Sequence, residues 1–184
     1  MNKRPAAAEL QSPRDRLLAY AFQALSRRAL SEAELRERLE RRSDDPELVA
    51  EVLARVQELG YQSDEVVAEA EARRRGVGQY RVRQKLKQRG LDDDLIQETL
   101  QERDPDAEED DAREQLQRRL AGFARKKNPR ASAYAWLTRR GYPSDVIRRL
   151  LEEVKDELPE PEPALRRSNW RCGGGKNGGG WGRS

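Results

Sequence analysis

The chain has 184 residues, and 39% of them are charged, yet 37 Lys and Arg against 34 Asp and Glu leave a net charge of only +3. Hydrophobic residues make up only 35%, which is low for one thick globular core and favours a thin, elongated protein. Because the sequence has no histidine, Ser-His-Asp and Cys-His nucleophile pairs and His-ligated metal sites are excluded.

The cysteine content and the length of the apolar runs indicate in which cellular compartment the protein is expected. The one cysteine, Cys172, has no partner for an internal disulfide, which fits a reducing compartment. The longest apolar run, residues 17–22, is far shorter than the roughly 20 residues that cross a membrane. Residues 1–12 lack the apolar stretch of a secretory signal and are expected to be flexible. We therefore expect a cytoplasmic protein with no membrane contact.

Apolar residues recur at spacings of three and four from about Pro13 to Asp156, and alternating β-branched runs are absent, so the sequence predicts an all-helical protein. N-cap residues followed by proline or an acidic residue mark the helix starts, and glycines mark several ends. These signals give nine predicted helices, at residues 13–28, 31–42, 46–59, 63–75, 79–89, 92–103, 108–126, 129–140 and 144–157.

The nine predicted helices form three groups with a repeated core pattern. When Leu39, Leu86 and Leu137 are aligned, branched aliphatic residues recur in each copy without a gap. A unit of three short helices cannot bury its apolar stripe alone, so the pattern predicts three tandem three-helix repeats in an elongated, curved array. The recurring positions are Val49, Ile96 and Ile147, followed by Leu53, Leu100 and Leu151.

The third repeat is set apart by extra length. The anchors are 47 residues apart between Leu39 and Leu86, and 51 between Leu86 and Leu137. We place the additional residues in an acidic linker around Asp104 to Asp111. The predicted organisation is a flexible N-terminus at 1–12, repeat 1 at 13–60, repeat 2 at 61–103, the acidic linker and repeat 3 at 104–157, and a disordered Pro/Gly-rich basic tail at 158–184.

Charge is segregated along the chain. Residues 73–90 and 118–140 hold eight basic residues each and no acid, whereas residues 92–114 hold twelve acids. A solvated helix face mixes signs, so unmixed basic stretches favour binding of phosphates or of an acidic protein groove, with intramolecular neutralisation by the acidic block as the alternative. The candidate partner- or DNA-binding residues are Arg73, Arg74, Arg75, Arg81, Arg83, Lys85, Lys87, Arg89, Arg118, Arg119, Arg125, Lys126, Lys127, Arg130, Arg139 and Arg140.

Within these stretches, Arg81, Lys85 and Arg89 are four residues apart and are expected on one helix face. Tyr80 and Tyr134 lie beside the cations, where a ring suits stacking on an unpaired base; burial in the core is the preferred interpretation of both. Trp136 is assigned no role.

Motifs for chemistry are absent from the sequence. Gly76-Val77-Gly78 lacks a preceding strand and a third glycine, so it is interpreted as a helix connection rather than a nucleotide loop. We expect no catalytic residues, no metal and no cofactor. The tail combines cations with two tryptophans, which suits either weak single-strand binding or a solubilising extension. Its residues of this kind are Arg166, Arg167, Trp170, Arg171, Lys176, Trp181 and Arg183.

Two sequence runs carry a resemblance to a known family. Residues 30–39, LSEAELRERL, are followed by Pro46-Glu47-Leu48-Val49 and Leu59-Gly60-Tyr61, and residues 81–91 read RVRQKLKQRGL. In order and spacing, residues 14 to 154 resemble the bacterial RecX family. The resemblance implies an all-helical protein of three three-helix units that binds in the groove of the filament of RecA and single-stranded DNA. It also implies inhibition of RecA ATPase, strand-exchange and coprotease activities, through a basic contact surface and without catalytic residues.

Two other hypotheses stay open at this point. Three-helix units are also the frame of helix-turn-helix domains, so the chain is alternatively a direct DNA-binding protein that acts without RecA. A pure protein scaffold of stacked helices fits the repeat period as well. In each case we expect a monomer.

Overall fold

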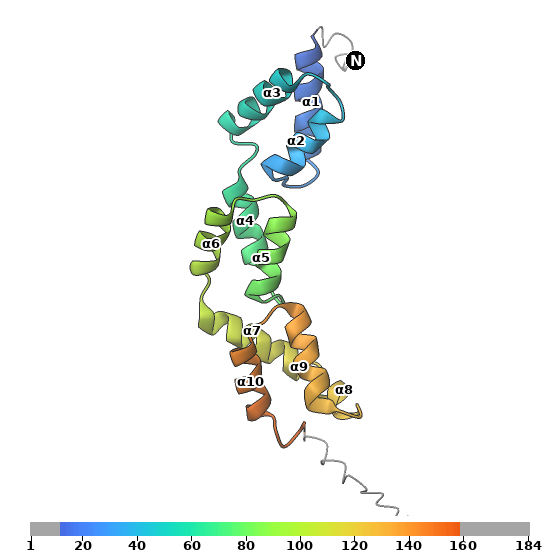
Figure 1. The fold of residues 1–184 in the computed structure, drawn as a ribbon, viewed down its shortest axis with the longest axis vertical. Helices are drawn as coiled ribbons and strands as arrows, with labels where there is room; N and C mark the ends of the chain where they lie inside the picture. The colour runs from blue at the N-terminus through green and yellow to red at the C-terminus, as the bar shows by residue number, and fades with distance from the viewer. Residues whose placement is uncertain (1–11, 159–184) are drawn as a thin grey trace, which may run out of the picture.

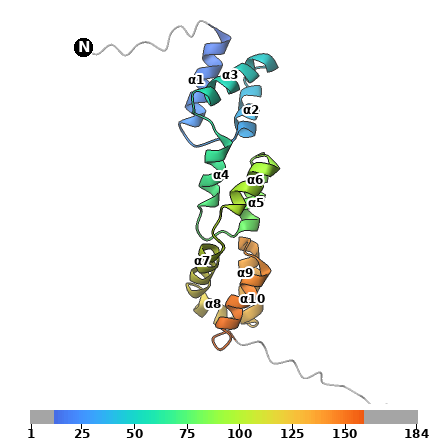
Figure 2. The same cartoon turned by 90° about the vertical axis from the view of Figure 1, so that its left-hand side faces the viewer.

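The computed structural model describes residues 12–158, which form ten α-helices and no strand. The helices follow one another along an elongated stack, with α1 at one end and α8 and α10 at the other (Figures 1 and 2). The predicted all-helical fold is therefore confirmed. The helices are α1 (Pro13–Leu25), α2 (Glu32–Glu40), α3 (Pro46–Glu58), α4 (Asp64–Ala72), α5 (Gln79–Gln88), α6 (Asp93–Gln101), α7 (Pro105–Gln117), α8 (Leu120–Ala124), α9 (Pro129–Arg140) and α10 (Ser144–Glu153).

The local signals explain why the helices begin and end where they do. Side chains of Ser or Asp accept hydrogen bonds from first-turn N–H groups at six helix starts, and these N-caps satisfy donors that have no partner inside the helix. At α2, Ser31 and Glu34 form the full capping box. Gly60, Gly90 and Gly141 follow α3, α5 and α9 with positive φ angles of 72°, 77° and 87°.

Three separate apolar cores stabilise the three units of the stack. Unit 1 (α1–α3), unit 2 (α4–α6) and unit 3 (α7–α10) each enclose a cluster of buried aliphatic side chains. The aligned anchors Leu39, Leu86 and Leu137 are each 0% exposed, one in each core. The repeated Leu and Ile positions are therefore core positions, with Leu100 half-buried. Each unit buries its own apolar stripe, so the expectation that a unit needs its neighbours for this is corrected.

The third unit differs from the sequence prediction in its first helix. Residues 108–126 are not one helix: α7 starts at Pro105, behind the N-cap Asp104, and the chain turns at Arg118 and Arg119 before the short α8. The predicted acidic linker is thus the beginning of α7. The Asp104-Pro105 start signal is of the same kind as Asp45-Pro46, so local sequence was sufficient to locate this helix start.

The predictions for the two ends of the chain fall mostly outside the described range. The structure does not describe residues 1–11 and 159–184. The predicted flexibility of the N-terminus, the predicted disorder of the tail and the state of Cys172 therefore lie outside the described residues. Leu158 is described, and it is not part of a free tail: its side chain is 0% exposed and packs in the core of unit 3. None of the described helices is both long and apolar enough to span a membrane.

Candidate partner-binding surface

Helices α5 and α9 are aligned end to end across the joint between units 2 and 3. The N–H of Gly78 donates to the carbonyl oxygen of Arg140 at 2.9 Å, and the N–H of Tyr80 donates to that of Gly141 at 3.1 Å. The C-terminus of α9 therefore meets the N-terminus of α5, and in both views one helix continues the line of the other (Figures 1 and 2). Basic residues on the two helices thereby become neighbours although about 58 positions separate Arg81 from Arg139.

The N-terminus of α5 is satisfied from unit 3 rather than from its own N-cap. Gly78 offers no side chain, and the N–H of Gln79 donates to a carboxylate oxygen of Glu108 on α7 at 2.7 Å. Glu108 is only 8% exposed, and its negative charge suits the positive end of the helix dipole. The sequence did not predict this role of Glu108, because the role depends on a contact between units.

The outer surface of α5 carries cations that no carboxylate neutralises. Val82 and Leu86 face the core of unit 2, while Arg81, Arg83 and Lys85 are exposed. These three cations form no ion pair with any carboxylate of residues 12–158; Arg81 instead donates to the carbonyl oxygen of Arg139 at 3.3 Å. We call Arg81, Arg83 and Lys85 the α5 basic face.

Arg89, the third member of the predicted row with Arg81 and Lys85, does not lie on this surface. Its side chain is 9% exposed and its guanidinium is 2.8 Å from the Glu34 carboxylate and 3.4 Å from that of Glu71. It also donates to the carbonyl oxygen of Ala29 at 2.8 Å. The prediction of a binding role for Arg89 is therefore corrected: it is the ion-paired link between units 1 and 2.

Several other candidate cations are neutralised within the chain. Each forms an ion pair with a nearby carboxylate, mostly three or four residues away on its own helix, and such exposed pairs contribute little to stability. The acidic block supplies Asp93 and Glu114, as the alternative hypothesis anticipated. The pairs are Arg73 with Glu69, Arg74 with Glu71, Lys87 with Asp93, Arg118 with Glu114, and Arg130 with Glu152.

Two further candidates lie against an aromatic ring in unit 3. The guanidinium carbons of Arg119 and Arg140 are 5.1 Å and 4.4 Å from the centre of the Trp136 ring, and Phe123 meets the same ring edge-on. Arg140 also donates to the carbonyl oxygen of Gly76 at 2.6 Å. Arg140 is therefore a structural residue of the joint, and cation–π contacts stabilise the half-buried Trp136.

The remaining candidates extend the basic surface along unit 3. Arg139 is exposed next to the Arg81 side chain, at the end of α9 that meets α5. At the opposite end of α9, the turn after α8 exposes Arg125, Lys126 and Lys127. The exposed cations of the second predicted stretch thus lie at both ends of α9, and only one end adjoins the α5 basic face.

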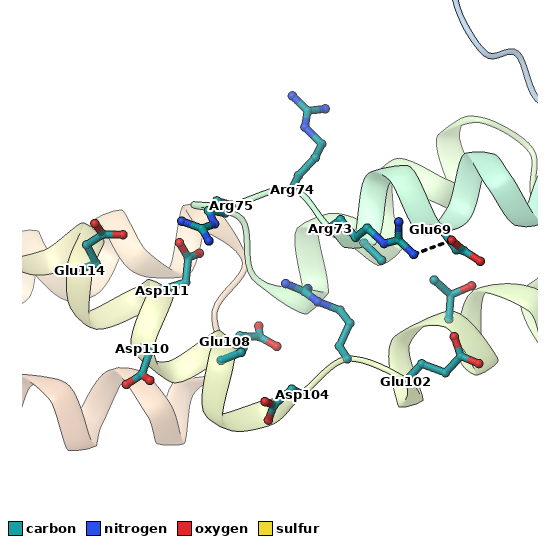
Figure 3. Close-up of a pocket in the computed structure, with 14 residues that line it drawn as sticks. Glu69, Arg73, Arg74, Arg75, Glu102, Asp104, Glu108, Asp110, Asp111 and Glu114 are labelled. Carbon is teal, nitrogen blue, oxygen red and sulfur yellow. Dashed lines mark hydrogen bonds and ion pairs between the residues drawn. The ribbon is translucent and has the colours of Figure 1, made fainter.

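A cleft of about 750 Å³ with charges of both signs opens between α4, α6 and α7. Arg73, Arg74 and Arg75 line one side, and the carboxylates of the acidic block line the other, with Arg75 directed toward Asp111 (Figure 3). Asp111 accepts hydrogen bonds from the N–H of Gly76 and the hydroxyl of Tyr142, each at 2.7 Å. Arg73 and Arg75 therefore face internal carboxylates, whereas Arg74 is paired with Glu71 and also lines a groove with Arg81 and Lys85 of the α5 basic face.

The ionisation of two groups at the joints follows from these contacts. Burial by itself raises the pKa of Glu34, but hydrogen bonds from Arg28, Arg89 and the Ser31 N–H outweigh it and lower that pKa to about 2. Burial and the Asp111 carboxylate raise the pKa of the Tyr142 hydroxyl far above its usual value. Among residues 12–158, no group of three or more His, Cys, Asp or Glu side chains is arranged to hold a metal ion.

The two tyrosines of the basic stretches are not equivalent. Tyr134 is half-buried and packs against the core of unit 3, as the preferred interpretation predicts. Tyr80 is 59% exposed, so burial was the wrong prediction for it. Val82 and Leu86 fill the core-facing side of α5, which leaves Tyr80 on the solvent side of the helix.

The fold and the surface together define a class: a stacked array of three-helix units with a basic helix face. Residues 65–100 match the family model described as RecX, second three-helix domain. A regulatory protein RecX of Deinococcus radiodurans is 58% identical over 160 residues, covering 87% of this chain and 78% of the relative. That of Chromobacterium violaceum is 34% identical over 143 residues, covering 77% and 92%. The chain belongs to the RecX family.

Solved structures agree with this assignment at the level of the fold. The crystal structure of RecX from Lactobacillus salivarius superimposes with a TM-score of 0.69, covering 77% of this chain and 96% of the other, at 15% sequence identity. A second crystal structure, of a regulatory protein RecX, gives a TM-score of 0.64 at 19% identity. The stacked three-helix architecture is therefore shared by proteins whose sequences have diverged widely.

Proposed function

We propose that this protein is a non-enzymatic negative regulator of the RecA recombinase. It binds in the groove of the filament of RecA and single-stranded DNA, and it inhibits RecA ATPase, strand-exchange and coprotease activities. The proposal places the protein in the cytoplasm, in homologous recombination, DNA repair and the SOS response. Membership of the RecX family, whose relatives are named regulatory proteins, supports it.

The single observation that carries the proposal is the α5 basic face. A filament of RecA and DNA presents phosphates and acidic protein surface, and Arg81, Arg83 and Lys85 are exposed without internal carboxylate partners. Binding to such a polyanion does not have to break existing ion pairs, because these cations have none within residues 12–158. The elongated stack adds length, so one molecule reaches more than one protomer of a helical filament.

The test is RecA ATP hydrolysis on single-stranded DNA with the full-length protein titrated in. We expect inhibition by the wild type, and at least a tenfold loss of potency when Arg81, Arg83 and Lys85 are all changed to Glu. A matched control reverses three exposed arginines elsewhere, Arg16, Arg27 and Arg148, and has the same net charge. Equal potency of the two variants, with helical content intact, would show that the α5 basic face is not the contact surface.

Direct DNA binding without RecA is the second candidate function, and the exposed Tyr80 beside the α5 basic face favours it. If this candidate is correct, the protein binds naked DNA strongly, and its inhibition of RecA follows occupation of the DNA. The affinity then falls with salt, at a log-log slope of about 0.7 to 0.9 for each phosphate neutralised. Inhibition at protein concentrations that leave naked DNA unbound supports the filament-directed regulator instead.

A further inference from the structure

Tyr80 stands apart from the other aromatic residues of the described chain. Each of the others has a partner for its ring or hydroxyl: Tyr20 lies under Arg42, Phe22 meets Tyr61, Phe123 meets Trp136, Tyr134 packs on the core, and Tyr142 bonds to Asp111. Within residues 12–158, no guanidinium and no other ring is stacked on Tyr80, and 59% of its surface is exposed. A single exposed ring is ordinary on a protein surface, so the surroundings of Tyr80 decide its meaning.

Those surroundings are polar and mostly basic, with a single carboxylate, Glu71, among the residues that line the two grooves. Tyr80, Gln84 and Gln88 follow one another at four-residue intervals along the solvent side of α5. They line a shallow groove together with Arg83 and Lys87. On the opposite flank, Gln84 and Gln88 line a second groove with Arg74, Arg81 and Lys85. Glu71 lines this groove as well, and it is ion-paired with Arg74. The solvent side of α5 therefore has a central row of one ring and two amides between two rows of cations.

The backbone of Tyr80 is fixed although its ring is exposed. Its N–H is bonded to the carbonyl oxygen of Gly141, and the neighbouring Gln79 N–H is bonded to Glu108. The ring is thus presented from the joint between units 2 and 3 rather than from a loop. A ring held in this way loses little conformational freedom when a flat ligand stacks on it.

We propose that the solvent side of α5 binds a single-stranded nucleic acid, with an unpaired base stacked on Tyr80, base edges on Gln84 and Gln88, and phosphates on the flanking cations. This assignment rests on the proposed function and names the part of the filament that the surface contacts. Amides donate and accept hydrogen bonds, as base edges require, and every base has a face that stacks on an aromatic ring. An acidic protein segment would match the cations but not the ring and amides.

The experiment compares two strands of equal length and charge in the absence of RecA. One is an oligothymidine and the other carries abasic sugar phosphates throughout, and binding of the full-length protein is followed by fluorescence anisotropy. We expect the wild type to prefer the thymidine strand, and Y80L to reduce that preference about tenfold, the order of magnitude of one lost base stack. Y80F keeps the ring and is expected to keep the preference.

The matched control is Y61L, since Tyr61 is 62% exposed but lies between α3 and α4, where its ring meets Phe22, and it lines neither groove of α5. It is expected to leave the preference unchanged. Equal affinity of the wild type for both strands would overturn the proposal and favour an acidic protein partner. An unchanged preference in Y80L, or an equal loss on both strands, would also overturn it.

The outcome is separable from that of the proposed function. If charge reversal of the α5 basic face abolishes RecA inhibition while Y80L retains the wild-type base preference, the regulator stands and the base-stacking role fails. If charge reversal leaves RecA inhibition unchanged, the α5 basic face is not the surface that contacts the RecA filament. This conclusion does not depend on the base preference of Y80L.

Discussion

The joint between units 1 and 2 (the side-chain joint) is built from charged and polar side chains, whereas the joint between units 2 and 3 (the backbone joint) combines direct backbone bonds with carboxylates that accept from backbone N–H groups. In the first, Arg89 connects Glu34 to Glu71, and the Ser31 hydroxyl donates to the carbonyl oxygen of Arg89 at 2.6 Å. In the second, backbone groups of Gly78 and Tyr80 bond directly to the end of α9. The first joint contains an ion pair between units, Arg89 with Glu34, so we expect salt to weaken it more than the second joint.

The difference also bears on function. The backbone joint keeps α5 and α9 aligned, and with them the α5 basic face and the exposed ring of Tyr80. At the side-chain joint, Arg89 forms ion pairs with Glu34 and Glu71 and links unit 2 to unit 1, so it is not exposed beside Arg81 and Lys85. Arginines of one helix thus have separate roles because their neighbours in other units differ.

The largest effect is expected at the backbone joint, from Gly78→Ala. A Cβ at this position lies 2.3 Å from the carbonyl oxygen of Gly141, although the backbone angles of Gly78 suit any residue. The two helix ends have to separate, and we expect the free energy of unfolding to fall by about 4 kcal/mol. Urea unfolding followed by circular dichroism measures it.

Gly122→Ala is the matched control, because a Cβ on this glycine of α8 has no heavy atom within 4 Å. It is expected to be neutral or to stabilise by up to about 1 kcal/mol. A Gly78→Ala protein as stable as the wild type would contradict the description of this joint.

The next largest effect is expected from Arg89→Met at the side-chain joint. Methionine keeps the apolar stem, but Glu34 and Glu71 lose a nearly buried partner, and we expect a loss of about 3 kcal/mol in urea unfolding. Lys87→Met is the control, because it removes a second cation near the end of α5 whose ion pair, with Asp93 of α6, is exposed. It is expected to lower the free energy of unfolding by less than about 1 kcal/mol. Similar losses from both changes would mean that Arg89 has no special role between the units.

The side-chain joint is expected to depend on pH through Glu34. The pKa of Glu34 is about 2 in the folded chain against 4.5 as its ordinary value, so its ionised form stabilises the fold fully above pH 4.5. This contribution is lost as the pH falls from 4.5 to 2. Discounted for solvent screening, it is about 2 kcal/mol, and Glu34→Gln removes it.

Urea unfolding at a series of pH values tests this expectation. The stability difference between wild type and Glu34→Gln is expected to be largest near neutral pH and to shrink toward pH 2. A difference that stays constant over this range would assign the effect of the substitution to packing instead of charge.

The smallest effect is expected from Ser31→Ala. The Ser31 side chain accepts from the Glu34 N–H at 3.2 Å and donates to the Arg89 carbonyl oxygen, so one hydroxyl serves both a helix start and a joint. We expect a loss of about 1.5 kcal/mol. Ser63→Ala, which removes the exposed N-cap of α4, controls for the cap alone and is expected to cost about half as much. Equal losses would indicate that the bond to Arg89 adds nothing.

The sequence alone determined most of the helices and the repeated core positions, because both depend on neighbours within a few residues. Ser31 with Glu34 starts α2, Gly141 ends α9, and the aligned Leu86 is buried, all as predicted from spacing and cap chemistry. The unpredicted start of α7 at Pro105 had the same kind of signal. The break at Arg118 and Arg119 had no clear signal, since neither residue terminates helices.

The candidate surface was decided by tertiary structure. Arg81 and Arg89 are alike in the sequence, yet one is exposed and the other is buried, because the partners of Arg89 come from Glu34 55 residues away and from α4. Tyr80 is exposed because α5 directs Val82 and Leu86 to the core, and it is held in place because its N–H bonds to Gly141 of unit 3. Periodicity assigns residues to a helix face, but the neighbouring unit determines whether that face meets water, a carboxylate or another backbone.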